Sequence, residues 1–231
     1  MFYVHQLLTT PSAERAALDA FLRDEWLPAV ARDDGSRLAW VAYGMDGSVA
    51  PDDVCLLTLV RDAAALARFG ERIRSGDLAK PAGQLAERVR AQRVRMLKPL
   101  RYSRFEDTIE SIPVEPQDGP TAAYMHDFVP PVPGQNRAYE DLMAERYMNL
   151  SDSALSEVVL RASCETVAGG GPQPEHFNLS EIRSSEALVK LLVYEIPKEH
   201  KQMGTWMWEA LGVRDQWTTR LVRSATWSPV R

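Results

Sequence analysis

The stretch MFYVHQLLTT at residues 1–10 recurs in similar form as AAYMHDFVPP at residues 122–131. Both stretches carry a tyrosine followed two residues later by a histidine, and His5 and His126 are separated by 121 residues. Side chains alternate between the two faces of a β-strand, so each stretch predicts a strand with its tyrosine and histidine on one face. A repeat of this kind indicates a chain built from two similar units.

The similarity continues past these strands and keeps its order along the chain. The matching stretches are residues 17–22 with 138–143, residues 58–61 with 180–183, and Val94–Arg95 with Val222–Arg223. The offset is steady within each predicted element and rises from 121 to 128 toward the end of the chain. Duplication followed by changes in loop length produces this pattern, and we therefore predict a tandem repeat.

Each half of the sequence predicts the order β-α-β-β-α-β. The expected strands are residues 2–9, 37–45, 53–61 and 94–103 in the first half and residues 121–129, 156–167, 176–183 and 217–227 in the second. Helical periodicity and turn signals separate them, including Gly44–Gly47 in one half and Gly169–Pro172 in the other. This order is the ferredoxin-like pattern of the α+β class.

We expect two domains, residues 1–104 and 121–231, joined by a linker at residues 105–120. The linker is rich in acids and prolines and has no apolar period, which is typical of an extended segment on the surface. A ferredoxin-like sheet has helices on one face and needs cover on the other. Two such antiparallel sheets in one chain can cover each other, which predicts an intramolecular α/β barrel.

The composition is that of an ordinary soluble globular protein, with 45% hydrophobic and 26% charged residues. The formal net charge of −5 gives no basic excess for a phosphate backbone, so we expect no nucleic acid partner. No apolar run is long enough to cross a membrane, and no signal peptide is recognised, so we expect a cytoplasmic protein. Cys55 and Cys164 lie in apolar runs and predict buried free thiols.

The duplicated arrangement resembles the dimeric α/β-barrel superfamily. Its members include cofactor-independent monooxygenases, polyketide cyclases, EthD-like proteins and, in a two-domain form, chlorite dismutase-like haem proteins. The strand-one histidine followed by FLRDEWLP at residues 21–28 is similar to the EthD pattern of an acidic and aromatic helix that ends in proline. The second half keeps Tyr147 in this pattern but has Asn149 where Pro28 stands.

The candidate catalytic residues are the repeated pairs Tyr3 with His5 and Tyr124 with His126. A histidine near its neutral pKa can accept a proton while a tyrosine on the same face donates one, which suits enolisation, ring closure or deprotonation of a phenol. The alternative is a half-buried histidine that only supports the strand. The second half is favoured as the active one, because Asp127 and His176 give it more polar groups.

Several other residues are candidates for binding a substrate: Arg61, Arg183, His176, Trp206 and Trp208. An arginine can anchor a carboxylate or enolate through two hydrogen bonds, although a surface ion pair explains each arginine equally well. His176 follows a glycine-rich turn that predicts either a lid or a simple hairpin. The two tryptophans flank Met207 and therefore point to different sides of their helix, so one of them can line a pocket for an apolar, planar ligand.

No metal site is expected, because the sequence has no HxxxH, HExxH or CxxC motif. No organic cofactor is expected either, because the repeated Tyr-x-His strand and the resemblance to cofactor-independent enzymes imply acid–base chemistry without one. His5, His126 and a carboxylate can meet only through the tertiary fold. For haem, the nearest helical candidate is His200, which lies among charged residues.

The sequence thus predicts a small-molecule enzyme that acts on an aromatic or polyketide-like substrate by His/Tyr acid–base chemistry. Cyclisation, dehydration and cofactor-free oxygenation all remain open. The alternatives are a non-catalytic ligand-binding or assembly protein and a haem protein with two α/β-barrel units. The expected partner is an aromatic or apolar small molecule, and a homodimer is a further possibility.

Overall fold

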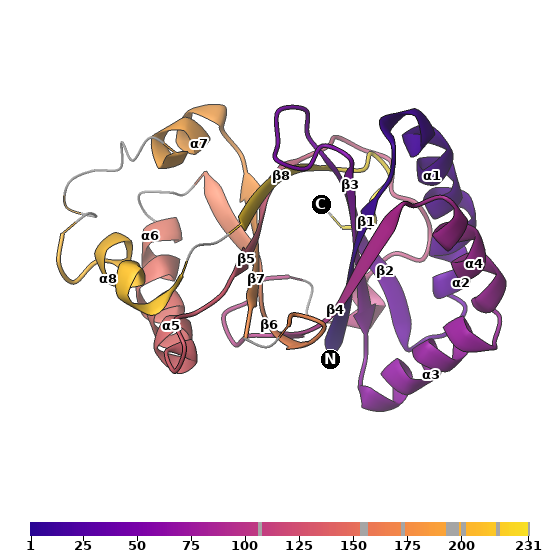
Figure 1. Ribbon diagram of the computed structural model, residues 1–231, viewed down its shortest axis with the longest axis horizontal. Coiled ribbons are helices and arrows are strands. Elements are labelled where there is room, and N and C mark those ends of the chain that lie inside the picture. Colours follow the sequence, from indigo (N-terminus) through magenta and orange to yellow (C-terminus); the bar gives the residue numbers. More distant parts are fainter. Residues whose placement is uncertain are drawn as a thin grey trace.

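The computed structural model describes residues 1–105, 108–152, 157–171, 174–192, 199, 202–215 and 218–230. A strand barrel stands at the middle of the molecule, with the helices of the first half on one side and those of the second half on the other (Figure 1). The predicted haem candidate His200 lies outside the described residues. Within the described part of the chain, no helix is long and apolar enough to span a membrane.

The elements follow the predicted order closely in both halves. The first half contains β1 (Phe2–Thr9), α1 (Arg15–Phe21), α2 (Leu27–Val30), β2 (Ser36–Gly44), β3 (Asp53–Val60), α3 (Ala63–Arg74), α4 (Ala79–Glu87) and β4 (Ala91–Pro99). The second half contains β5 (Ala123–Val129), α5 (Asn136–Leu142), α6 (Met148–Asp152), β6 (Val158–Ala168), β7 (His176–Ile182), α7 (Ser185–Leu192), α8 (Trp206–Val213) and β8 (Thr218–Ser224).

The eight strands close into one antiparallel barrel in the order β1-β3-β2-β8-β5-β7-β6-β4. Each half contributes four neighbouring strands in the ferredoxin-like order, β4-β1-β3-β2 from the first and β8-β5-β7-β6 from the second. The two sheets join where β2 pairs with β8 and where β4 pairs with β6. The predicted α+β class and the intramolecular barrel are therefore confirmed, whereas an origin by tandem duplication stays a prediction.

Irregularities of the backbone also recur at matching places. A π-helical turn follows α1 at Leu22–Trp26 and another follows α5 at Met143–Tyr147, again 121 residues apart. The register of β2 shifts between Leu38 and Trp40, and that of β6 shifts between Leu160 and Ala162. These breaks in regular pairing bend the strands at the same point of each sheet.

The register of the last strand in each half differs from the sequence prediction. Arg95 pairs with His5, and Arg220 pairs with His126. Arg95 therefore corresponds to Arg220, and the predicted match with Arg223 is wrong by three residues. The similarity of Val94–Arg95 to Val222–Arg223 was misleading because both strands are short, basic and partly exposed, so their sequences fix the register poorly.

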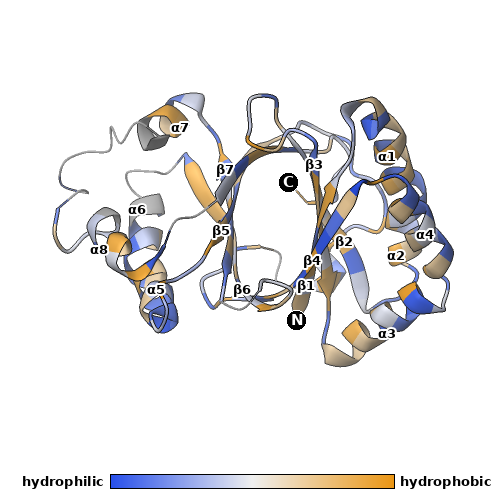
Figure 2. Ribbon diagram, in the orientation of Figure 1, coloured by the Kyte–Doolittle hydropathy of each residue, from blue (hydrophilic) through white to orange (hydrophobic). Residues whose placement is uncertain are grey.

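Three apolar cores fill the molecule: one inside the barrel and one beneath the helices of each half. Hydrophobic residues occur along strands of both halves (Figure 2), and every residue of β3 is buried, because the sheet faces the barrel interior on one side and a helix layer on the other. The helices provide the cover for the outer face of each sheet, as the ferredoxin-like pattern requires.

The predicted linker does not lie only on the surface, because part of it is buried in the barrel. Phe105, Ile109 and Ile112 are buried and belong to the core inside the barrel. Phe105 meets the ring of Tyr3 edge to face, with their centroids 5.7 Å apart. Three apolar residues spaced among acids and prolines gave no period in the sequence, because an irregular segment that closes a barrel has no regular face to bury.

Candidate functional site

His5 and His126 meet at the centre of the barrel. Their Nε2 atoms are 2.8 Å apart, and both side chains are fully buried. The two strands that carry them come from opposite halves, so the barrel brings together residues that are 121 positions apart in the chain. The repeat predicted two similar histidines, and the structure shows that they form one pair.

Aromatic rings surround this pair. The ring of Phe128 lies 5.2 Å from that of His5, and the ring of Phe177 lies 5.1 Å from that of His126. Tyr3 and Tyr124 share the same core, and Tyr124 packs edge to face on Trp40 at 5.4 Å. All four predicted catalytic residues therefore point into one apolar interior.

Both histidines are neutral in this environment. Burial lowers the pKa of His126 to about 3, and it also holds the pKa of His5 well below its usual value. The positive charges of Arg95 and Arg220 act in the same direction on both rings. A neutral pair can share one Nε2–H hydrogen bond.

Two ion pairs inside the barrel cross from one half to the other. Arg95 Nε lies 2.9 Å from Glu175 Oε2, and Arg220 Nε lies 2.8 Å from Asp53 Oδ2. The guanidinium group of Arg95 also stacks over the ring of Phe128 at 3.8 Å. The sequence does not mark these four charged residues as part of a site, because only the strand register shows that both arginines stand beside the histidines.

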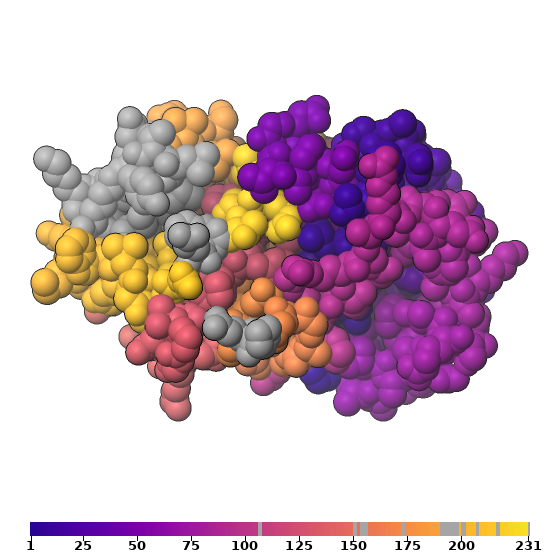
Figure 3. All heavy atoms as spheres, in the orientation of Figure 1, coloured from indigo at the N-terminus to yellow at the C-terminus, as the bar shows by residue number. Residues whose placement is uncertain are grey.

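The described hollows of the surface do not reach the histidine pair. One hollow of about 750 Å³ lies beside α1, and another of about 410 Å³ lies beside the glycine-rich turn that follows β6. Neither is lined by His5 or His126. In the space-filling view, atoms of both halves cover the middle of the barrel that looks open in the ribbon (Figure 3).

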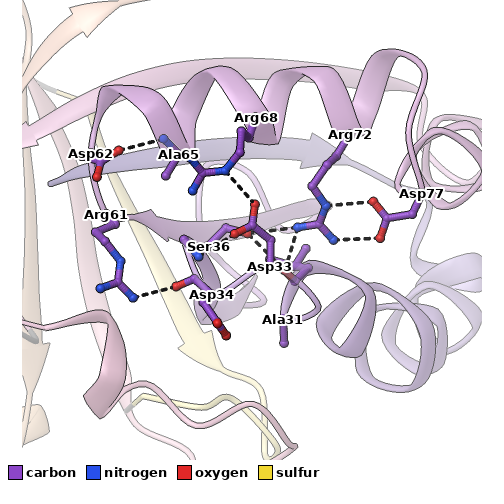
Figure 4. Close-up of polar contacts among 12 residues, drawn as sticks. Ala31, Asp33, Asp34, Ser36, Arg61, Asp62, Ala65, Arg68, Arg72 and Asp77 are labelled. Atoms are coloured by element: carbon purple, nitrogen blue, oxygen red, sulfur yellow. Dashed lines mark hydrogen bonds and ion pairs between the residues drawn. The ribbon is translucent and has the colours of Figure 1, made fainter.

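The two predicted binding arginines lie on the surface. Arg61 donates to the backbone oxygen of Asp34 at 2.9 Å, as Figure 4 shows, and it forms an ion pair with Glu110 at 2.8 Å. Arg183 forms an ion pair with Glu181, with 3.4 Å between Arg183 Nε and Glu181 Oε2. About half of each arginine side chain is exposed, so the structure places neither beside the histidines.

A second polar cluster lies between the sheet and the helices of the second half. Asn178 of β7 donates from Nδ2 to the hydroxyl of Tyr139 at 3.0 Å and accepts from the hydroxyl of Ser163 at 2.7 Å. Ser163 also lies 3.4 Å from the hydroxyl of Tyr102. Because Tyr139 accepts the hydrogen bond from Asn178, its own O–H remains able to donate. Together with His176, Asn136 and Asp127, which are described below, these residues form what we call the C-terminal polar layer.

His176 extends the C-terminal polar layer toward the surface. Its Nε2 lies 2.7 Å from Asn136 Oδ1, an atom that can only accept, so His176 is the donor. Asn136 in turn donates to Glu140 at 3.0 Å. Burial lowers the pKa of His176 to about 4, so the ring is neutral and its buried Nδ1 carries a lone pair. Asn136 lines the hollow of about 410 Å³.

Asp127 adds a carboxyl group to the same layer. It follows His126 in the chain and therefore faces the helices while His126 faces the barrel. Burial raises the pKa of Asp127 to about 7, against the lowering effects of a hydrogen bond with Thr219 and the charge of Arg214. Its Oδ1 atom is buried without a hydrogen-bond partner among the described residues. The negative charge of Asp127 helps to raise the pKa of Tyr147, after the larger effect of burial.

The two tryptophans that were predicted to bind a substrate lie on different sides of α8, as their spacing in the sequence predicted. Trp206 is buried and packs against Tyr147, with ring centroids 5.2 Å apart, and the guanidinium carbon of Arg214 lies over the Trp206 ring, 5.2 Å from its centroid. Trp208 is 52% exposed on the opposite side of α8. Trp206 therefore forms an aromatic wall of the C-terminal polar layer, and Trp208 does not.

In their present arrangement, the described histidines do not offer haem an axial ligand through Nε2. A haem iron needs an axial ligand with a free donor atom. The Nε2 atoms of His5 and His126 face each other, and Nε2 of His176 is bound to Asn136. Within the described part of the chain, no histidine therefore offers a free Nε2, and we derive no step through haem.

Comparison with known proteins identifies the fold. No protein-family model matches the chain, and no curated protein sequence matches it. Among solved structures, it is similar to a protein assigned as a monooxygenase from Lactobacillus acidophilus NCFM, with a TM-score of 0.59 and 13% identity over 99% of this chain and 97% of the other. An anthrone oxidase-like protein gives a TM-score of 0.59 and 16% identity over 97% and 91%.

A third similar structure is the chlorite dismutase from Candidatus Nitrospira defluvii, with a TM-score of 0.53 and 12% identity over 97% of this chain and 91% of the other. Identities this low establish the fold alone. The closed eight-stranded barrel is the fold that the resemblance to the dimeric α/β-barrel superfamily implied, and membership of that superfamily stays a prediction. The narrower likeness to EthD proteins stays a prediction.

Proposed function

We propose that this protein is an oxygenase-type enzyme that acts on a phenolic or enolisable aromatic compound in the C-terminal polar layer. The observation that carries the proposal is the hydrogen-bonded group of Tyr139, Asn178 and Ser163, buried beside an aromatic wall. A ligand site is typically apolar with a few well-placed polar groups, and this layer has that character. The fold likeness to proteins assigned as a monooxygenase and as anthrone oxidase-like supports the choice of reaction.

Each polar group has a role in this scheme. Oδ1 of Asp127 accepts a proton from the substrate, since it is a buried carboxylate atom with no hydrogen-bond partner in the described part of the chain. The O–H of Tyr139, held by Asn178, donates to the oxygen on which negative charge develops. Trp206 and Tyr147 form the wall against which an aromatic ring packs.

An anthrone illustrates how the reaction balances. Removal of one proton from its methylene carbon gives an enolate, which dioxygen then oxidises. One oxygen atom forms the new carbonyl group and the other leaves as water with the two hydrogens of the methylene carbon. The substrate supplies all the electrons, so the reaction needs no organic cofactor.

The proposal assigns the acid–base roles to Asp127 and Tyr139, whereas the sequence alone favoured His5 and His126. The two histidines are hydrogen-bonded to each other through Nε2, whereas Oδ1 of Asp127 has no hydrogen-bond partner among the described residues. Acid–base work by that pair remains an alternative, as does a role in ligand binding without catalysis.

Dioxygen uptake with anthrone as the probe tests the proposal. We expect the wild-type protein to consume oxygen and form anthraquinone, and Asp127→Asn to slow this turnover about a hundredfold. Gln6→Ala is the matched control, because Gln6 occupies the place of Asp127 in the first half, and it should leave turnover unchanged. Equal rates for wild type and Asp127→Asn would refute the role of Asp127. A Soret band in the visible spectrum of the purified protein would instead favour haem chemistry.

A further inference from the structure

The barrel centre holds three side chains that can bind a metal ion. His5, His126 and Cys55 each offer one ligand atom, and these atoms all lie within 4.8 Å of one another. They come from β1, β5 and β3, and all three side chains are fully buried. The sequence predicted no metal site and suggested only a carboxylate as a third ligand, because the approach of Cys55 to the histidines depends on the tertiary fold.

Small movements convert this cluster into a coordination site. The two Nε2 atoms are 2.8 Å apart, whereas a trigonal ion with metal–nitrogen bonds of about 2.0 Å needs them about 3.5 Å apart. The rings must therefore separate by roughly 0.7 Å, and Cys55 must turn its sulfur toward them. The phenylalanine rings that surround the pair leave the ion in an apolar environment.

The ligand types and the charges identify the class of ion. A thiolate with two imidazoles is a soft donor set that suits copper and zinc. Zinc usually takes four ligands in a structural site, and the cluster offers three among the described residues. The nearby carboxylates of Asp53 and Glu175 are already bound to Arg220 and Arg95.

The net charge of the occupied site distinguishes a monovalent ion from a divalent one. Arg95 and Arg220 are each paired with a carboxylate, so these two ion pairs add no net charge to the barrel centre. A monovalent ion with one thiolate is neutral overall, whereas a divalent ion would leave a net positive charge in an apolar interior, and burying a charge is costly. We propose that the barrel centre binds one monovalent copper ion through His5, His126 and Cys55.

Anaerobic titration with Cu(I) against the chromogenic chelator bicinchoninate tests this site. We expect wild-type protein to bind one equivalent, and Cys55→Ser to bind about a hundredfold more weakly. Cys164→Ser is the matched control, because Cys164 is the other buried thiol of the same core and is not part of the cluster, and it should bind like wild type. Circular dichroism verifies that each variant is folded.

X-ray absorption at the copper edge of the loaded wild-type protein gives a second readout that does not depend on a variant. The site predicts one sulfur and two nitrogen neighbours around the ion. Absence of a sulfur neighbour, unchanged binding by Cys55→Ser, or binding of Zn(II) in place of Cu(I) would each overturn the proposal.

Discussion

The two halves of the molecule share a backbone plan but differ in what lies between sheet and helices. Tyr139, Asn178 and His176 of the second half occupy the places of Leu18, Leu56 and Val54 in the first. Three neutral polar groups thus replace three aliphatic ones. The first half retains only Gln6 and Thr58 as buried polar groups on the facing sides of β1 and β3.

This difference distinguishes the side chains that the fold requires from those that a binding site requires. The apolar layer of the first half is sufficient to hold a ferredoxin-like unit together, so the fold does not require the hydrogen-bonded chain of the second. Buried polar groups cost free energy unless they are paired, and the C-terminal polar layer meets that cost with internal hydrogen bonds. We infer that the second half was adapted for binding and the first for support.

The largest expected effect comes from exchanging the central residues of the two layers. Leu56→Asn places an amide among aliphatic side chains and should lower the free energy of unfolding by about 4 kcal/mol. Asn178→Leu keeps a similar volume and should cost only about 1–2 kcal/mol, because Ser163 can still bond with Tyr102. Urea denaturation measures both, and equal losses would contradict the contrast between the layers.

A smaller effect concerns acid stability and His176. Since its pKa falls from 6.5 to about 4 on folding, the unfolded chain binds the proton more tightly, and stability is lost as the pH falls from 6.5 toward 4. The contribution of this ring at pH 4 is at most about 3 kcal/mol. His176→Val, which restores the residue of the first half, should flatten the fall in melting temperature over this range. An unchanged slope would show that His176 is not the neutral, buried group described above.

The smallest effect is expected at the two exposed arginines. Arg61→Ala and Arg183→Ala should each change the free energy of unfolding by less than about 1 kcal/mol, because exposed ion pairs contribute little. Both variants should also keep the wild-type rate of anthrone oxidation. A large loss of rate in Arg183→Ala alone would extend the functional site of the second half to its surface.

The sequence was sufficient to predict the barrel but not the side-chain contacts inside it. Local periodicity defined the strands, and the repeat of Tyr3 and His5 set the correspondence of β1 with β5. The contact between His5 and His126, the approach of Cys55 and the crossed ion pairs of Arg95 and Arg220 all depend on the register of strands that are distant in sequence. The favoured second half rested on Asp127 and His176, which the structure places together with Tyr139 and Asn178 in one layer.

One measurement tests the central claim most directly, namely that the second half holds the ligand. We would titrate anthraquinone-2-sulfonate, a soluble analogue of the expected product, into isotopically labelled protein and follow assigned amide and side-chain signals by NMR. The account predicts shifts concentrated on Tyr139, Asn178, His176 and Trp206. Shifts concentrated instead on Leu18, Leu56 and Val54 would contradict it, as would shifts confined to exposed residues.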